Sequence, residues 1–320
     1  MSEDLELDVA SVRTALGDDG RFIGPDPGRR PRYELFHAAG SICSHKVRAV
    51  LAYHGLAYRS HALNLFTGQT YLPPYVRLRM AGCDRLGTGL AAHHDGSTST
   101  SQSGCDGAVV PTLVDWDVGA VIVDSKLICL HLDEGIEAVR RLRPEGLEGA
   151  IDAELEIVDN FPNYQMLMAR ASAPAGSGVT KGSIGGSFSN RKVAWCEAYL
   201  RDYADDEVLV RAYSAKRAKE ASAAASLFAD EALGAARARA DTALRGLEDR
   251  LGRSGGPWLF GDSFTMADLF WGIELIRMKG VGAAASWTEG RLPRVESLLA
   301  AAELVPAIRA AVIDWPGALL

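Results

Sequence analysis

A cysteine at the start of a predicted helix has the clearest chemical potential in this chain. Residues 33–48 begin with an alternating apolar stretch, pass through the turn residues Gly40 and Ser41, and reach Cys43 just before apolar residues recur at helical spacing. Free N–H groups and the dipole at a helix N-terminus favour negative charge, so the Cys43 thiol is expected to lose its proton near neutral pH. The alternative is that Cys43 is a small core residue beside an apolar helix.

The elements that must position this cysteine follow a recognisable order. Residues 58–65 and 109–115 read as strands, residues 121–125 as a further strand, and a helical pattern follows from Leu127. With the first strand and helix, the order is strand, helix, strand, helix, two strands, helix, which is the thioredoxin layout. Pro111 opens the third strand, where proline is sterically acceptable, and a cis bond between Val110 and Pro111 is expected there.

A second motif lies more than 200 residues further on. Residues 258–268 read Trp-Leu-Phe-Gly-Asp-Ser-Phe-Thr-Met-Ala-Asp, and Thr265 with Asp268 has the spacing of a capping box at a helix N-terminus. This pattern predicts a structural role, in which the two side chains begin a core helix and take no part in chemistry.

Together the two motifs resemble those of the soluble glutathione transferases. Residues 33–134 resemble their glutathione-binding domain, with its Val-Pro-x-Leu turn and its acidic–Ser pair, and residues 258–268 resemble the signature of their helical domain. The resemblance implies an α/β N-terminal thioredoxin-like domain, here residues 33–135, followed by an all-α C-terminal domain, residues 148–320. Residues 1–32 would then be an N-terminal extension.

The resemblance also implies how glutathione would bind. The tripeptide would lie extended along the backbone of Val110 and Pro111, and Ser125 with the helix it opens would hold the γ-glutamyl carboxylate. Asp124 would pair with the γ-glutamyl ammonium. A hydrophobic, aromatic electrophile is the second substrate that the resemblance implies, and no metal is expected.

Within the family, two segments resemble bacterial tetrachlorohydroquinone reductive dehalogenases. They are the string Ser-Ile-Cys-Ser-x-Lys-x-Arg from Ser41 to Arg48 and residues 74–78. The glutathione sulfur would lie near Ser41 and Cys43. In reductive dehalogenation the glutathione thiolate displaces halide to give an aryl thioether, and Cys43 attacks its sulfur to release the reduced aromatic. A second glutathione would clear the mixed disulfide.

Two alternatives stay open. Ser41 or Ser44 could activate glutathione for simple conjugation or for aryl-ether cleavage, although the greater nucleophilicity of sulfur favours Cys43. A non-catalytic, transferase-like binding module is the second alternative, and the retained Cys43, Pro111 and Asp124–Ser125 pair argues against it. The electrophile is not identified by the sequence, since its candidate lining residues could equally be core; these are Phe161, Tyr164, Met166 and Met168.

Length and composition allow one large or two ordinary domains with substantial cores and agree with an enzyme of this class. The chain has 320 residues, 48% of them hydrophobic, and a net charge of -7, which offers no basic face for nucleic acid. The basic cluster at residues 211–219 is predicted to be a solvent-exposed face of a helix. No apolar run approaches the roughly 20 residues that span a bilayer, so a cytoplasmic protein without membrane partners is expected. The family resemblance implies a two-fold homodimer, which is also the commonest homo-oligomer. The odd set of five cysteines favours reduced thiols.

Three segments depart from a minimal transferase. Residues 1–32 contain a Pro- and Gly-rich stretch and are expected to form a tail. The insertion 81–107 is expected to form a flexible flap beside the glutathione site; a metal site or a disulfide between its cysteines is a weaker alternative, involving Cys83, His93, His94 and Cys105. Residues 171–190, rich in Gly and Ser, are expected to lie above the substrate pocket.

Overall fold

A mixed sheet of five strands organises the N-terminal half of the chain. The structure is a computed structural model that describes residues 3–25, 28, 30–169 and 183–318. The strands lie in the order β1-β3-β2-β4-β5; β2 and β3 are parallel, and the other neighbours are antiparallel. Their bounds are β1 Arg21–Ile23, β2 Tyr33–His37, β3 Tyr58–Ala62, β4 Thr112–Asp115 and β5 Ala120–Val123.

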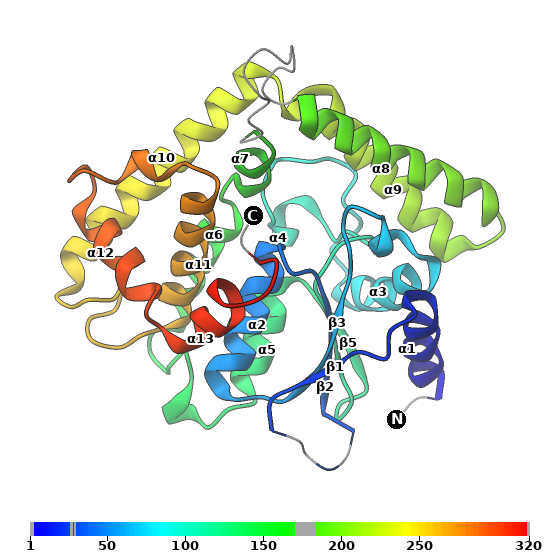
Figure 1. The fold of residues 1–320 in the computed structure, drawn as a ribbon, viewed down its shortest axis with the longest axis horizontal. Coiled ribbons are helices and arrows are strands. Elements are labelled where there is room, and N and C mark those ends of the chain that lie inside the picture. The colour runs from blue at the N-terminus through cyan, green and yellow to red at the C-terminus, as the bar shows by residue number, and fades with distance from the viewer. Residues whose placement is uncertain (1–2, 26–27, 29, 170–182, 319–320) are drawn as a thin grey trace.

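Helices cover both faces of this sheet. Helices α2 (Ile42–His54) and α5 (Ser125–Glu134) lie on one face, while α1 (Glu3–Leu16) and α3 (Pro73–Leu86) lie on the other (Figure 1). Short helical turns occur at η1 Gln69–Tyr71, α4 Thr100–Ser103 and η2 Ala138–Arg140. The strand and helix order from β2 to α5 confirms the thioredoxin-like prediction, and the Val110–Pro111 bond is cis as expected.

The prediction of an N-terminal tail is wrong for most of residues 1–32. Helix α1 buries Leu5, Val9 and Val12, which share one helix face because they are spaced four and three residues apart, and it packs against α3. Its Arg13 donates to the buried Glu34 of β2 at 2.6 Å. Strand β1 then extends the sheet antiparallel to β3. The extension is therefore an integral part of the N-terminal domain.

The C-terminal half is helical, as predicted. Helices α11 and α13 pack against α2, so this domain covers the sheet face that carries α2 and α5 (Figure 1). The capping box at Thr265 and Asp268 begins α11 and confirms the structural reading of that motif. The bounds are α6 Glu148–Asp159, α7 Asn163–Ala169, α8 Ser183–Asp202, α9 Glu207–Ser222, η3 Ala223–Leu227, α10 Asp230–Ser254, α11 Met266–Gly280, η4 Ala284–Ser286, α12 Pro293–Ala302, α13 Pro306–Ile308 and η5 Arg309–Ile313.

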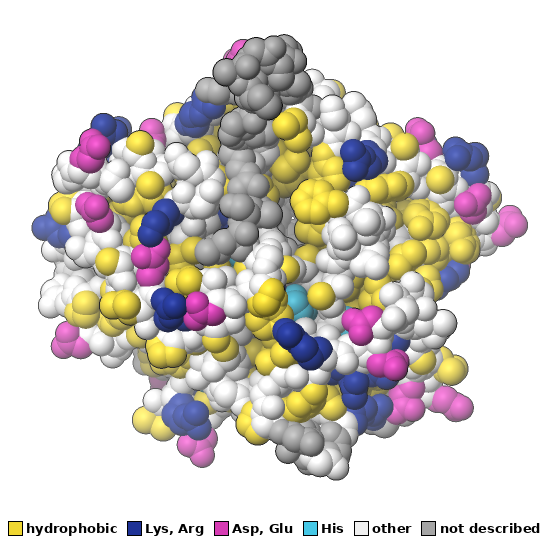
Figure 2. Space-filling view, viewed as in Figure 1, with side chains coloured by type: hydrophobic (Ala, Val, Ile, Leu, Met, Phe, Trp, Pro, Cys, Tyr) yellow, Lys and Arg dark blue, Asp and Glu magenta, His cyan; other side chains and the backbone are white. Residues whose placement is uncertain are grey.

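Helices α8 and α9 form a hairpin that reaches across to α3 (Figure 1). Hydrophobic side chains gather on this side of the molecule (Figure 2). The solvated-face prediction for residues 211–219 is wrong for Lys216, which is buried and pairs with Asp106 at 2.7 Å. Of the segment 171–190, which was expected to lie above the substrate pocket, residues 183–190 form the start of α8; residues 171–182 lie outside the described residues.

The insertion 81–107 is tied down at both ends and along its length. Cys83 and Cys105 form a disulfide with their Cα atoms 5.7 Å apart, so the expectation of five reduced thiols is wrong for this pair. The Thr98 N–H donates to the Asp159 carbonyl at 3.0 Å, and the His94 ring stacks on Tyr164 with centroids 4.6 Å apart. The segment is therefore an ordered bridge to the helical domain rather than the expected flap.

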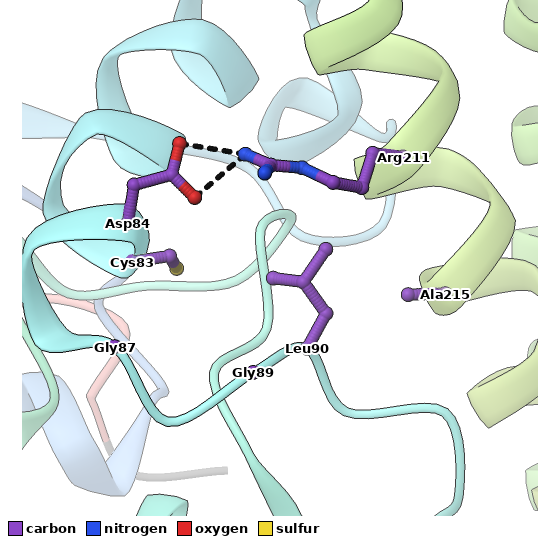
Figure 3. A pocket seen from close by; sticks show the side chains of 7 residues that line it. All are labelled: Cys83, Asp84, Gly87, Gly89, Leu90, Arg211 and Ala215. Carbon is purple, nitrogen blue, oxygen red and sulfur yellow. Dashed lines mark hydrogen bonds and ion pairs between the residues drawn. The ribbon is translucent and has the colours of Figure 1, made fainter.

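A small cavity of about 350 Å³ lies beside this disulfide (Figure 3). The ion pair between Asp84 and Arg211 crosses its rim at 2.6 Å. Its lining contains none of the residues predicted to bind glutathione or to react; it consists of Cys83, Asp84, Gly87, Gly89, Leu90, Arg211 and Ala215.

Candidate active site

The turn before β4 is held from behind by α3. The Tyr75 hydroxyl donates to the Val109 carbonyl at 2.6 Å, and the Arg79 guanidinium donates to the Pro111 carbonyl. Both side chains are buried. Within the described part of the chain, the backbone N–H and C=O of Val110 form no hydrogen bond. A backbone with a free donor and a free acceptor suits an extended peptide ligand such as glutathione.

The start of α5 provides the second half of this binding surface. Asp124 has a φ of 72°, and its Oδ1 accepts from the N–H groups of Lys126 and Leu127 at 2.9 and 3.1 Å. Its Oδ2 has no partner among the described residues, which leaves it for an ammonium group. Ser125 is the first residue of the helix, where unpaired N–H groups favour an anion. This arrangement fits the two ends of a γ-glutamyl group.

The two candidate serines have different surroundings at the start of α2. Ser41 is the N-cap residue, and its Oγ accepts from the Ser44 N–H at 3.3 Å. Because Oγ acts as the acceptor there, the Ser41 O–H is still able to donate to a ligand. Ser44 is fully buried, and its Oγ accepts from the Ala38 N–H at 3.2 Å. Ser44 therefore supports the turn from inside the protein.

Cys43 lies in the first turn of α2 and is half-buried. Burial raises the pKa of the Cys43 thiol, and the Lys46 charge with a hydrogen bond from Ser125 only partly offsets that rise. Asp159 and Asp124 push the pKa in the same direction as burial. The prediction of a lowered pKa is therefore wrong for the protein without glutathione, because the cost of desolvating a thiolate exceeds the benefit of the helix N-terminus.

A buried ion pair adjoins Cys43, and the sequence did not point to it. Lys46 is fully buried, and its Nζ lies 2.7 Å from Asp159 Oδ1 at the end of α6. The same Nζ lies 4.5 Å from the centre of the Phe270 ring. Lys46 belongs to the Ser41–Arg48 motif around Cys43. Its partner Asp159 is 113 residues away, and no sequence pattern identifies it.

A buried carboxyl on α11 completes this cluster. Burial raises the pKa of Glu274 to about 7, although a hydrogen bond from Asn163 and the charge of Lys46 act against the rise. The Asn163 amide donates to Glu274 Oε1 at 2.6 Å. The cluster therefore joins α2, α6, α7 and α11 where the two domains meet.

The residues proposed as a substrate lining divide between two places. Phe161 is buried in the main core, and Met166 packs against that core. Tyr164 and Met168 pack against a separate cluster that contains Phe228. The Tyr164 hydroxyl also lies 3.0 Å from Lys192 Nζ. Within the described ranges, no group of three or more His, Cys, Asp or Glu side chains could hold a metal ion.

A thioredoxin-like domain with a cis-proline turn, joined to a helical domain that begins its central helix with a capping box, defines the glutathione transferase class. The chain belongs to the glutathione S-transferase family: the family's N-terminal domain matches residues 40–134 and its C-terminal domain matches residues 221–301. The predicted family and fold are thereby confirmed, and glutathione is the cosubstrate of this family. Residues 135–220, which include the α8–α9 hairpin, lie between the two matches.

Two relatives match this chain over nearly its whole length. It is 32% identical to the 2,5-dichlorohydroquinone reductive dechlorinases of two strains of Sphingobium indicum, over 99% of this chain and 96% of theirs. Among solved structures, the β-etherase LigF from Sphingobium sp. strain SYK-6 matches with a TM-score of 0.57 and 15% identity, over 88% of this chain and 98% of its own.

A glutathione S-transferase from Methylobacillus flagellatus with glutathione bound matches with a TM-score of 0.50 and 14% identity, over 87% of this chain and 98% of its own. At such identities, similarity to these solved structures supports the fold alone. Across the described residues, every helix is too short or too polar to span a bilayer.

Proposed function

We propose that this protein is a glutathione-dependent reductive dehalogenase that acts on a halogenated hydroquinone. The observation that carries the proposal is the position of the Cys43 thiol, in the first turn of α2 and close to Ser125 at the N-terminus of α5. A thiol placed at the glutathione-binding surface can attack a glutathione sulfur. The 32% identity to reductive dechlorinases of a chlorinated hydroquinone supports this substrate class.

The proposed binding mode uses the free groups described above. Glutathione lies along Val110, its γ-glutamyl ammonium meets the free Asp124 Oδ2, and its carboxylate meets Ser125 and the α5 N-terminus. Ser41 donates its hydroxyl hydrogen to the glutathione sulfur, which stabilises the thiolate form.

The proposed chemistry has three balanced steps. Glutathione first replaces the halogen on the ring, giving an aryl thioether, halide and a proton. The Cys43 sulfur then attacks the thioether sulfur; the carbon–sulfur bond breaks with its electron pair on the ring, and that carbon takes up the proton from the Cys43 thiol. A second glutathione exchanges with the mixed disulfide and restores Cys43, so that one oxidised glutathione forms per halide released.

The serine alternatives are less well supported by these surroundings. Ser44 is buried and already engaged with the turn, so it has no access to glutathione. Ser41 has the right position to assist the first step, which reductive dehalogenation shares with conjugation and ether cleavage. Neither alternative gives Cys43 a role, and a non-catalytic module would need neither residue.

We also propose a cytoplasmic two-fold dimer. The cytosolic glutathione pool supplies the reductant that this reaction consumes. Closed two-fold dimers are the commonest homo-oligomers. The apolar side of the molecule near α8 carries an exposed Phe66 in the β3–α3 connection, whose ring is tilted against that of Phe188 of α8 with the centroids 5.8 Å apart. This apolar surface is the proposed contact between subunits.

Product stoichiometry tests the proposed reaction. With glutathione and 2,5-dichlorohydroquinone, the proposal predicts equal amounts of chloride and oxidised glutathione and no thioether in the final mixture. Chloride release with a stable glutathione conjugate and no oxidised glutathione would instead establish conjugation.

A further inference from the structure

We propose that Lys46 is a positioning residue for Cys43: its ammonium group, held in place by Asp159, stabilises the thiolate that attacks the aryl–glutathione sulfur. This inference rests on the proposed role of Cys43 in resolving the thioether. Neither Lys46 nor Asp159 has to touch the aromatic substrate or glutathione to act in this way.

The position of Lys46 on α2 is the first support. It follows Cys43 by three residues, and side chains at that spacing are neighbours on a helix, with Cβ atoms about 5–6 Å apart. Lys46 is fully buried, so water and salt screen its charge far less than at the surface. Lys46 is also the largest influence that favours the charged form of Cys43.

The other groups around Cys43 have a weaker or an opposite effect on the pKa of its thiol. Ser125 at the start of α5 also favours the charged form, whereas Asp124 beside it and Asp159 at the end of α6 disfavour a second negative charge. From α11, Glu274 interacts electrostatically with Lys46. Among the described residues, Lys46 is therefore the main cation that acts on this thiol.

Asp159 explains why the ammonium stays charged and in place. Burial alone would lower the pKa of Lys46, but the charge and hydrogen bond of Asp159, together with Cys43 and Glu274, outweigh burial and keep that pKa above its usual value. Lys46 consequently acts as a fixed positive charge and does not donate a proton in the reaction. Lys46 lowers the free energy of the Cys43 thiolate that attacks the thioether sulfur, and the proton that the thiol gives up is the one that the ring carbon takes up.

The insertion 81–107 contacts Asp159, the carboxylate of the Lys46–Asp159 ion pair. The Thr98 N–H donates to the Asp159 carbonyl at 3.0 Å, and the Thr98 hydroxyl donates to the same oxygen at 3.3 Å. Ser101 on the adjoining turn donates to Glu156 of α6 at 3.0 Å. The bridging segment thus fixes the end of α6 and, through it, the side chain that orients Lys46.

The test follows the titration of Cys43 without any aromatic substrate. Iodoacetamide alkylation of Cys43, followed by peptide mass spectrometry between pH 6 and 11, gives its apparent pKa. Lys46→Met should raise that pKa by about one unit and slow alkylation at pH 7 about tenfold, because a close opposite charge is lost. Lys46→Arg should keep the wild-type titration.

The contrast between Lys46→Met and Lys46→Arg separates an electrostatic role from a structural one. Removing one member of a buried ion pair can impair folding, so the double variant Lys46→Met/Asp159→Asn, which leaves no unpaired charge from this pair, is the folded reference. It should still show a raised apparent pKa, since Lys46 outweighs Asp159 at Cys43. An unchanged titration in Lys46→Met and in the double variant would overturn the inference. Failure of the proposed function would show elsewhere, as identical aromatic products from the wild type and Cys43→Ser.

Discussion

Ser125 at the N-terminus of α5 lies close enough to Cys43 at the N-terminus of α2 to act against the rise in the pKa of its thiol. The residue expected to hold the γ-glutamyl carboxylate therefore also acts on the expected nucleophile. Glutathione binding and the protonation of Cys43 share one side chain, so a change at Ser125 should affect both.

Replacing Ser125 with alanine is expected to weaken glutathione binding and to raise the apparent pKa of Cys43. A hydrogen bond to a charged group contributes about 1.5–3 kcal/mol, which corresponds to a KM for glutathione raised at least tenfold. Steady-state kinetics at varied glutathione measures the first effect and alkylation measures the second. Ser297→Ala, on the exposed face of α12, is the matched control and should change neither. A normal KM in Ser125→Ala would remove Ser125 from the glutathione site.

Glu274 is expected to make stability depend on pH. Burial raises its folded-state pKa from 4.5 to about 7, so the native state binds the proton more tightly than the unfolded chain. This stabilisation is complete below the unfolded pKa and is lost as the pH rises to about 7; it amounts to about 3 kcal/mol. Glu274→Gln should abolish the dependence. Urea unfolding of both proteins at pH 5, 6, 7 and 8 measures it, and parallel curves would contradict the buried carboxyl's role.

The Cys83–Cys105 disulfide is expected to stabilise the insertion. A cross-link between residues 22 positions apart restricts the unfolded chain by about 3 kcal/mol. Cys83→Ser/Cys105→Ser should lower the free energy of unfolding by roughly that amount. A reducing agent should destabilise the wild type to the same degree and leave the double variant unchanged. Equal stability of both proteins under oxidising conditions would show that the cross-link does not form.

The proposed dimer contact makes Phe66 a sensitive position. Phe66→Asp places a charge on the apolar surface and should convert a dimer into a monomer in light scattering at micromolar concentration. Val139 is 90% exposed but lies away from α8 on η2, so Val139→Asp is the control and should leave the dimer intact. A wild-type monomer, or a Phe66→Asp dimer, would count against this contact.

Features with local causes were predictable from the sequence. The cis bond before Pro111 and the capping box at Thr265 each depend on a few adjacent residues, and both occur as expected. Helix α1 was not predicted because the prolines and glycines after it favour an irregular segment, although Leu5, Val9 and Val12 have helical spacing.

Features that depend on distant partners were not predictable. Nothing near Lys46 indicates Asp159, and nothing near Lys216 indicates Asp106; both lysines were brought inside by carboxylates more than 100 residues away. The raised pKa of Cys43 has the same origin, because its burial depends on how the two domains pack. A helix N-terminus can be identified from sequence, but the desolvation that opposes it cannot.

The most direct test of the central claim is single-turnover mass spectrometry of the wild type and Cys43→Ser with glutathione and 2,5-dichlorohydroquinone. Only the second step needs the thiol, so Cys43→Ser should consume the aromatic and accumulate its glutathione thioether, while the wild type releases the dechlorinated hydroquinone. Identical products formed at similar rates by both proteins would contradict the account, because Cys43 would then have no part in the reaction.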